Sequence, residues 1–179
     1  MAVSTTHAAI WAAMAFAVLN DRGSTWDVMQ LINPLNHSDS PDEIGVYRVE
    51  PFVVAADVYG TPPHVGRGGW TWYTGSAGWM YRLILESLVG VQREANKLTF
   101  KPCLPPEWTS VGLHYRFNET LYRITVYQTS EERSAGIRVD GVASDEQYLV
   151  LADDRHEHVV EVYASIGPHA RTKEPSLAS

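Results

Sequence analysis

The first half of the chain carries apolar residues at the spacing of α-helices. Residues 6–19 are apolar almost throughout and form a predicted helix with Thr5 or Thr6 as its N-cap. A second helix, capped by Ser24, is predicted to run to residue 31 and to form an αα-hairpin with the first. Because the first helix is apolar on nearly every side, we expect it to be buried on more than one face.

Two further helices are predicted before the pattern changes. Residues 49–59 form a short apolar run in which Pro51 fits the first helical turn. Residues 74–94 carry apolar side chains at helical spacing. Long irregular or glycine-rich loops separate the helices, and this alternation predicts a toroid of helical hairpins with the loops gathered at one end.

From residue 96 onward, apolar and polar residues alternate with the period of β-strands. Six segments show the alternation: residues 98–100, 111–117, 121–127, 135–139, 147–151 and 158–163. This half is therefore predicted to be an antiparallel β-sandwich. The division is a helical part (1–95), a β part (96–165) and a tail (166–179) that is expected to be disordered because it is rich in Pro, Ser and Lys.

Composition narrows the class of protein. The chain has 179 residues, of which 45% are apolar and 11% aromatic, as in a folded globular protein. Its net charge of −7 and the lack of any Lys or Arg run argue against nucleic acid as a partner. Cys103 is the single cysteine, which excludes a disulfide framework and a thiolate metal site. Between proline and leucine it is expected to be a small buried apolar residue.

The apolar run at residues 8–19 resembles a targeting signal only superficially. No Lys or Arg precedes it, and it is shorter than the roughly 20 residues that a bilayer requires. We therefore expect a buried helix, neither signal peptide nor membrane span in this chain, and a cytoplasmic location.

The segment at residues 64–82 is rich in glycine and in aromatic rings and contains no carboxylate. Glycines let a backbone approach another group closely, and flat rings line the walls of binding sites. The rings offer a stacking surface of the kind that sugars use: Trp70, Trp72, Tyr73, Trp79 and Tyr81. A core hairpin with buried aromatic residues explains the same composition, so both interpretations stay open.

Three residues are candidates for binding an anion. His37 lies in irregular sequence after a predicted helix end, where its imidazole can donate a hydrogen bond; a solvated, idle histidine is the alternative. Thr74 and Gly75 open a helix directly after the aromatic segment, where free N–H groups and the helix dipole favour negative charge. The alternative for Thr74 is a plain helix cap.

The carboxylates in the first half are less decisive. Glu50 precedes Pro51 at a predicted helix start, where it interacts favourably with the N-terminus. Asp57 lies within an apolar run and needs a partner if it is buried; Arg48 or Arg67 would serve. In the second half, the acids and histidines at residues 153–158 are interpreted as a solvated hairpin end. No metal site is expected there, and no catalytic-triad, Walker or zinc spacing occurs.

Three stretches carry a resemblance to a known family. Residues 47–59, 64–82 and 98–108 closely resemble the C-terminal part of cyclic β-1,2-glucan synthases, whose module is similar to glycoside hydrolase family 94, the cellobiose and chitobiose phosphorylases. The resemblance implies an α+β fold: the C-terminal part of an (α/α)6 toroid followed by an antiparallel β-sandwich. It leaves open whether the parent enzyme is associated with the inner membrane.

The resemblance also implies a site. In the family, phosphate is held by a histidine from an Asn-Pro-x-Asn-His-like loop and by a Thr-Gly pair that opens a helix, which correspond to His37, Thr74 and Gly75. No cofactor is implied, because inorganic phosphate is a co-substrate. Contacts to the sugar are expected from five residues: Trp70, Trp72, Tyr73, Glu50 and Arg67. The expected ligands are a β-glucan oligosaccharide and phosphate.

The sequence departs from the family at its start. The family's general acid and a phosphate-binding arginine lie upstream of the region that this chain resembles, so no catalytic residue is assigned here. We expect a C-terminal fragment of an inverting glycoside phosphorylase or glycosyltransferase that has no turnover alone; glucose 1-phosphate release by the purified chain would contradict this. The alternative is a non-catalytic carbohydrate-binding or structural remnant. Association with the missing part, or self-association, is expected because a truncated toroid exposes apolar helices.

Overall fold

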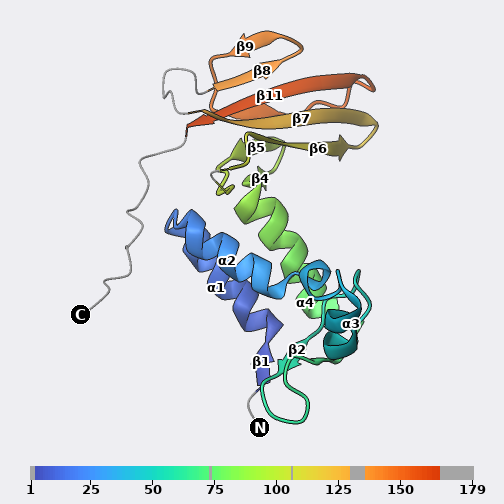
Figure 1. Ribbon diagram of the computed structural model, residues 1–179. Coiled ribbons are helices and arrows are strands. Elements are labelled where there is room, and N and C mark those ends of the chain that lie inside the picture. Colours follow the sequence, from blue (N-terminus) through green and yellow to red (C-terminus); the bar gives the residue numbers. More distant parts are fainter. Residues whose placement is uncertain (1–2, 73, 106, 130–135, 166–179) are drawn as a thin grey trace, which may run out of the picture. The chain divides into compact units, whose positions relative to one another are not determined.

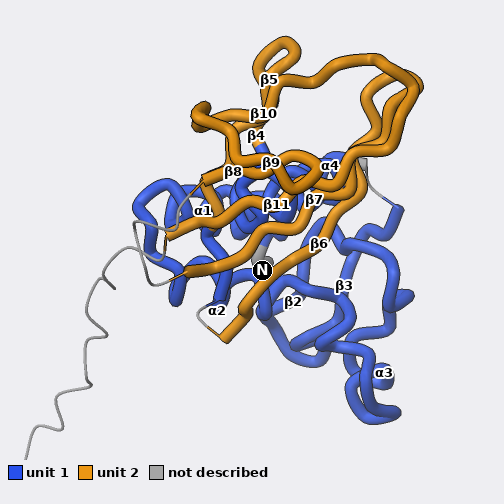
Figure 2. The backbone as a smooth tube through the Cα atoms, turned by 90° about the horizontal axis from the view of Figure 1, so that it is seen from above, with its two compact units in different colours: residues 1–91, 103–105 blue, residues 92–102, 106–179 orange. Residues whose placement is uncertain are grey.

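The computed structural model describes residues 3–72, 74–105, 107–129 and 136–165 (Figure 1). The chain divides into two compact units, drawn in blue and orange in Figure 2. Unit 1 comprises Met1–Val91 with Cys103–Pro105, and unit 2 comprises Gln92–Pro102 with Pro106–Ser179. The predicted tail at 166–179 lies outside the described residues.

Unit 1 begins with the predicted helical hairpin. α1 (Thr6–Val18) has Thr5 at its N-cap, and α2 (Arg22–Ile32) begins two residues before the predicted cap. Asp21 is the actual cap of α2, since its carboxylate accepts a hydrogen bond from the Ser24 amide at 3.1 Å. The two helices share a core with the later helix of this unit, formed by Ile10, Ala13, Met29, Met80, Leu83 and Leu88.

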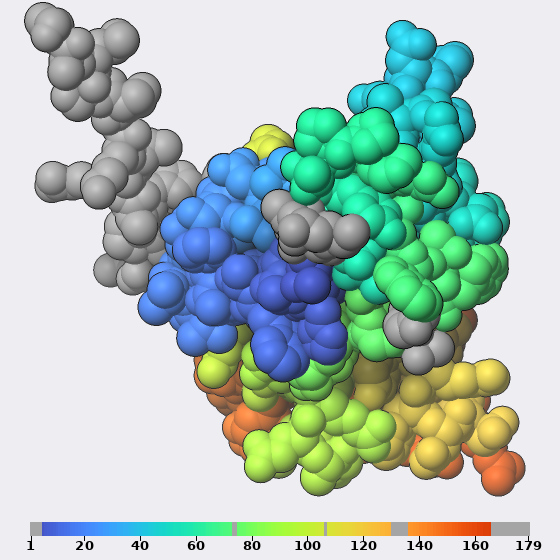
Figure 3. Space-filling model, turned by 90° about the horizontal axis from the view of Figure 1, so that it is seen from below, coloured from blue at the N-terminus to red at the C-terminus, as the bar shows by residue number. Residues whose placement is uncertain are grey.

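One face of α1 remains open, contrary to the expectation that several faces would be buried. Val18 is 86% exposed, Leu19 at the C-cap is 74% exposed, and Trp11 is also exposed. Figure 3 shows surface from the N-terminal region in dark blue. The described part of unit 1 offers α1 partners on one side only, so its outer apolar residues meet solvent. No helix among the described residues is long and apolar enough to cross a bilayer.

Short elements connect α2 to the last helix of unit 1. A 3₁₀ turn (η1, Pro34–His37) precedes α3 (Pro41–Tyr47), whose N-cap Ser40 accepts a hydrogen bond from the Glu43 amide and donates one to the Glu43 carboxylate. Three short strands then form an antiparallel sheet in the order β1-β2-β3: Val3–Thr5, Asp57–Tyr59 and Gly68–Gly69.

The predicted helix over residues 49–59 is wrong. α3 ends at Tyr47 because Arg48 adopts a left-handed φ of 55°, and the chain then runs irregularly into β2. Three apolar residues of this stretch pack around Tyr47: Val49, Val53 and Ala55. Residues that look helical in sequence are therefore used in a small local core, and tertiary packing outweighs helix propensity.

The predicted long helix at 74–94 is correct at its start and wrong at its end. α4 (Thr74–Arg82) continues into a π-helical turn (η2, Leu83–Leu88), where the Val89 amide donates to the Ile84 carbonyl five residues earlier. Gly90 then adopts a φ of 77°, which suits glycine and ends the helix. The last residues of the predicted helix, Val91–Glu94, form a β-strand instead.

Unit 2 contains the predicted strands, arranged in two sheets. One has the order β10-β5-β4 and the other β6-β7-β11-β8-β9. Their bounds are β4 Val91–Glu94, β5 Lys97–Phe100, β6 Ser110–Phe117, β7 Thr120–Thr129, β8 Gly136–Val139, β9 Val142–Ser144, β10 Tyr148–Val150 and β11 Glu157–Ser165.

The larger sheet corrects the prediction of a purely antiparallel β part. β11 pairs with β7 in parallel, from Glu157 opposite Leu121 to Ser165 opposite Thr129. On its other side, β11 pairs antiparallel with β8. The parallel pairing is possible because the segment after β10 returns to the end of the sheet at which β7 begins. β11 therefore runs through the middle of the sheet in the same direction as β7.

A histidine is clamped between two turns of unit 2, at the end of a segment whose residues 153–157 are exposed, as predicted. The His158 Nδ1 atom lies 2.7 Å from Asp140, and its Nε2 atom lies 3.0 Å from Asp154. Its ring stacks on Tyr122, with centroids 5.2 Å apart. Because carboxylates only accept hydrogen bonds, both ring nitrogens carry protons when both contacts are made. The clamp therefore holds an imidazolium.

The clamp predicts that the stability of unit 2 depends on pH. The hydrogen bond with Asp140, helped by Asp154, raises the pKa of His158 despite partial burial, and the same bond lowers the pKa of Asp140. A histidine whose pKa is raised by folding contributes stability that is fully present below its unfolded pKa of about 6.5. This stability is lost as the pH rises through the folded-state pKa. The free energy of unfolding should thus fall on the alkaline side of about pH 6.5.

Urea denaturation at several pH values measures this dependence, with NMR titration of the His158 ring. Asp140→Asn should lower the His158 pKa and flatten the pH dependence. Asp145→Asn, which removes an exposed carboxylate outside the clamp, is the control. If the free energy of unfolding changed with pH to the same extent in both variants and in the unmodified chain, the clamp would be contradicted.

Candidate functional site

The glycine-rich segment of unit 1 packs against the small core around Tyr47. A Cβ atom on Gly68 would collide with the Val49 side chain and would lie 3.2 Å from Tyr47 Cε2 and 3.3 Å from Ala55 Cβ. Gly68 is therefore a glycine because β3 approaches this core closely. The core interpretation of the segment is correct for this glycine.

Gly69 makes the same kind of close approach on the neighbouring side. A Cβ atom there would collide with Asp57 and would lie 2.9 Å from Tyr59 Cε2. The Asp57 Oδ1 atom is buried without a hydrogen-bond partner among the described residues. Arg48, one predicted partner, instead donates through Nε to the Gly45 carbonyl at 2.9 Å. The structure thus shows no Arg48–Asp57 pair.

Two tryptophans of the same segment are exposed and do not pack into the core. Trp70 and Trp72 have φ values of 50° and 65°, and their side chains are 64% and 69% exposed. Left-handed backbone is unfavourable for any residue with a side chain, and exposed aromatic rings forgo burial. For these two residues, the binding-surface interpretation fits and the core interpretation does not.

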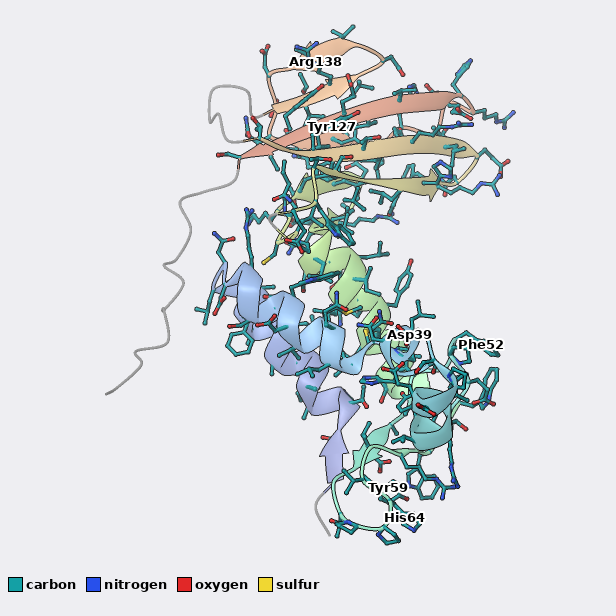
Figure 4. The ribbon with its side chains drawn as sticks, viewed as in Figure 1. Asp39, Phe52, Tyr59, His64, Tyr127 and Arg138 are labelled. Atoms are coloured by element: carbon teal, nitrogen blue, oxygen red, sulfur yellow. The ribbon has the colours of Figure 1, made fainter. Side chains whose placement is uncertain are left out.

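Trp72 contacts Glu50, which was predicted to belong to the site, and Phe52, which was not. Its Nε1 donates to Glu50 Oε1 at 3.4 Å, and its ring meets Phe52 edge-on with centroids 6.2 Å apart. Phe52 is exposed and points away from the helices of unit 1 (Figure 4). The Glu50-Pro51-Phe52 sequence was the available signal, since an aromatic residue next to a candidate binding carboxylate suits a site wall. Glu50, Phe52 and Trp72 are thus brought together.

His37 is fixed to the same region through Tyr47. Its Nε2 lies 2.8 Å from the Leu31 carbonyl, which can only accept, so Nε2 is the donor. The His37 and Tyr47 rings lie 5.2 Å apart at 34°, and burial raises the pKa of Tyr47. His37 is therefore anchored rather than idle, and its Nδ1 is the nitrogen left for a ligand.

The remaining predicted site residues are distributed unevenly. Thr74 begins α4, within about 7 Å of Trp72 along the chain because it follows Trp72 by two positions. Gly75 has open space where a Cβ would stand. Tyr73 lies outside the described residues. Arg67 belongs to the far end of the β2–β3 pair, where its backbone bonds to Tyr59 and His64; within the described part of the chain, no hydrogen bond or ion pair joins it to Glu50 or Trp72.

Trp79 does not join the exposed rings. It packs with His7 and Trp11 of α1, at centroid distances of 5.8 and 5.4 Å, and Arg82 lies 4.8 Å above its ring. The stacking surface is thus smaller than predicted and centres on Trp70 and Trp72. Among the described residues, no group of three or more His, Cys, Asp or Glu side chains is placed to hold a metal ion.

Comparison with known proteins decides the family. Residues 2–90 match the glycosyl hydrolase 94 superfamily, catalytic domain, and residues 92–138 match the glycosyl hydrolase family 65, C-terminal domain. Over 135 residues, 75% of this chain, it is 43% identical to the cyclic beta-(1,2)-glucan synthase NdvB of Rhizobium meliloti. The chain belongs to the glycosyl hydrolase 94 superfamily.

Further relatives of this glycosyl hydrolase 94 chain are phosphorylases. It is 23% identical to solabiose phosphorylase of Paenibacillus borealis over 87% of this chain, and 28% identical to N,N'-diacetylchitobiose phosphorylase of Vibrio furnissii over 78%. The chain spans 5% of the glucan synthase and 20% and 18% of these two phosphorylases. Its relatives place it in a carbohydrate-active family, and the two matched domains meet where the two units divide.

Proposed function

We propose that this chain supplies part of the phosphate- and sugar-binding site of an inverting glycoside phosphorylase or glycosyltransferase that acts on β-linked glucan, of the cyclic β-1,2-glucan synthase type. The observation that carries the proposal is the pair of exposed tryptophans with left-handed backbone, Trp70 and Trp72. Strained, exposed aromatic residues persist where they serve a ligand. The glucan synthase and phosphorylase relatives support sugar and phosphate as the ligands.

The sugar side of the site uses two kinds of contact. The Trp70 and Trp72 rings provide flat apolar surfaces for the C–H faces of a pyranose. The Glu50 carboxylate, 3.4 Å from the Trp72 indole nitrogen, is an acceptor for sugar hydroxyls at the edge of those rings. Phe52 extends the wall on the same side.

The phosphate side combines a positive imidazole with backbone amides. His37 already donates from Nε2 to Leu31, so it donates to phosphate from Nδ1 as the imidazolium. Thr74 and Gly75 add the free amides and dipole of the α4 N-terminus. In the complete enzyme, phosphate attacks the anomeric carbon with inversion while an acid protonates the leaving oxygen. Phosphate replaces the activated water of an inverting hydrolase, so a single catalytic carboxyl suffices.

Phosphate titration of the purified chain, followed by calorimetry, tests the proposal. His37→Ala should weaken phosphate binding about tenfold, because it removes a hydrogen bond from a charged donor. His114→Ala removes an exposed histidine of β6 in unit 2 and is the control. Thr74→Ala tests the helix end without disturbing the His37–Leu31 bond.

The outcomes separate the two functional candidates. Loss of phosphate affinity in His37→Ala but not in His114→Ala supports a phosphorylase-type site. Sugar binding without measurable phosphate binding in the unmodified chain would favour the alternative, a non-catalytic carbohydrate-binding remnant. We propose in addition that the exposed α1 face, with Val18 and Leu19, associates with further protein, which sedimentation at several concentrations would detect.

A further inference from the structure

A cavity lies within unit 2, and none of its lining residues is assigned to phosphate or sugar above. Its volume is about 270 Å³, and strands of both sheets contribute to its walls. The polar side chains that line it are Tyr122, Ser144, Glu146, Tyr148, Asp154 and His158. The volume is just below the roughly 300–1,000 Å³ of pockets for drug-sized ligands, so it suits a single small ring.

The floor of this cavity is rigid. Tyr122 is buried, and its hydroxyl both accepts from the Ala152 amide at 2.7 Å and donates to the Ala152 carbonyl at 2.9 Å. His158 stacks on the Tyr122 ring, and both of its nitrogens are engaged by carboxylates. The Tyr122 ring is buried, so the floor meets the cavity through the part of the His158 ring that stays exposed, and that ring is held in a fixed place. Such a surface binds without an ordering cost.

The upper wall has polar groups without protein partners. The Glu146 amide donates to Ser144 Oγ at 3.1 Å, which orders this turn, while the Glu146 carboxylate is exposed. Among the described residues, neither that carboxylate nor the Tyr148 hydroxyl makes a hydrogen bond. The Tyr148 ring is held by Lys97, whose ammonium lies 4.0 Å from its centroid. Two acceptors for a ligand therefore line the same cavity as the rigid Tyr122–His158 pair.

The chemistry of the lining selects a class of ligand. Glu146 and Asp154 are carboxylates, and no Lys or Arg of the described chain lines the cavity. The charge of His158 is matched by its two aspartates. This lining repels anions and accepts hydrogen bonds from hydroxyl groups, while the His158 ring with Val139 and Val150 favours a small apolar face. A neutral pyranose combines those two features.

We propose that this cavity of unit 2 is a second sugar-binding site, which takes one neutral pyranose unit at the end of a glycan. Glu146 and Tyr148 bind its hydroxyls, and its apolar face packs on the His158 ring and on Val139 and Val150, which line the same cavity. The site is independent of the tryptophan site in unit 1, and it distinguishes neutral sugars from the sugar phosphates that an anion site accepts.

NMR titration of the ¹⁵N-labelled full chain with methyl β-D-glucopyranoside tests this. We expect shifts at residues 144–150 and a dissociation constant on the order of 1 mM, typical of one small ligand with few contacts. Glu146→Gln, which keeps the shape and removes the charge, should weaken that binding about tenfold. Asp145→Asn, the adjacent carboxylate outside the lining, should leave it unchanged.

Glucose 1-phosphate provides the second comparison, and it should produce no shifts at residues 144–150. Tyr148→Phe, which retains the ring and the Lys97 contact, should weaken sugar binding less than Glu146→Gln. The proposal is overturned if Glu146→Gln and Asp145→Asn behave alike, if shifts occur only near Trp70 and Trp72, or if no shift occurs at 50-fold excess over about 1 mM. Shifts of equal size with a simple ammonium salt would also overturn it, because the site would then be one for cations.

Discussion

Gly68→Ala is expected to destabilise unit 1 by about 2–3 kcal/mol. The added Cβ would collide with Val49, which is buried, and Val49 cannot swing aside because its branched side chain is stiff at χ1. The Tyr47 and Ala55 side chains close the other directions. The substitution therefore separates β3 from the small core, which also carries His37 through Tyr47, and phosphate affinity should fall with stability.

Gly78→Ala is the matched control. Gly78 lies within α4, and nothing stands within 4 Å of its Cβ position. Alanine there should stabilise the helix by about 0.5–1 kcal/mol. Tryptophan fluorescence during urea denaturation reports mainly on unit 1, because five of the six tryptophans belong to it. Equal stability of the two variants would show that β3 does not need its glycine.

Trp72→Gly is expected to change stability and ligand affinity in opposite directions. Glycine relieves the left-handed backbone at φ 65°, and the exposed ring gives up little buried surface. Thermal and urea unfolding should show a gain of about 1 kcal/mol. Loss of the stacking surface should weaken binding of a β-1,2-linked glucan oligosaccharide about tenfold.

Trp72→Ala separates the two effects. Alanine removes the ring but keeps a side chain on the left-handed backbone, so it should lose the affinity without gaining the stability. Calorimetric titration with the oligosaccharide and urea denaturation of both variants complete the comparison. If Trp72→Gly binds as tightly as the unmodified chain, the ring does not serve the ligand and another reason for its strain is needed.

The elements with strong periodicity were predictable from sequence. The strands at 111–117 and 121–127 alternate with period two, and the helix at 6–19 is an unbroken apolar run behind a threonine cap; the structure confirms all three. The helix at 49–59 failed because its apolar residues have partners elsewhere: Val49 meets Gly68, nearly 20 residues away. A local pattern cannot show which distant segment will cover it.

The candidate site was predictable in part for the same reason. Trp70, Trp72 and Glu50 stand in a segment with a strong family resemblance, and the structure places Trp72 beside Glu50. Arg67 was expected at the same site, but the β2–β3 register places it opposite Tyr59, at the end of the pair away from Gly69. Likewise, the clamp around His158 depends on the parallel pairing of β11, which no alternation pattern reveals.

The central place of β11 bears on how the protein is made. Its neighbours β7 and β8 both precede it in the chain, and β8 does not pair with β7. On the ribosome, a nascent chain that ends before Glu157 holds two hairpins whose inner edges have no strand between them. Every segment of unit 1 has emerged by Pro105. Unit 1 can therefore fold while synthesis continues, whereas the larger sheet of unit 2 must wait for its last strand.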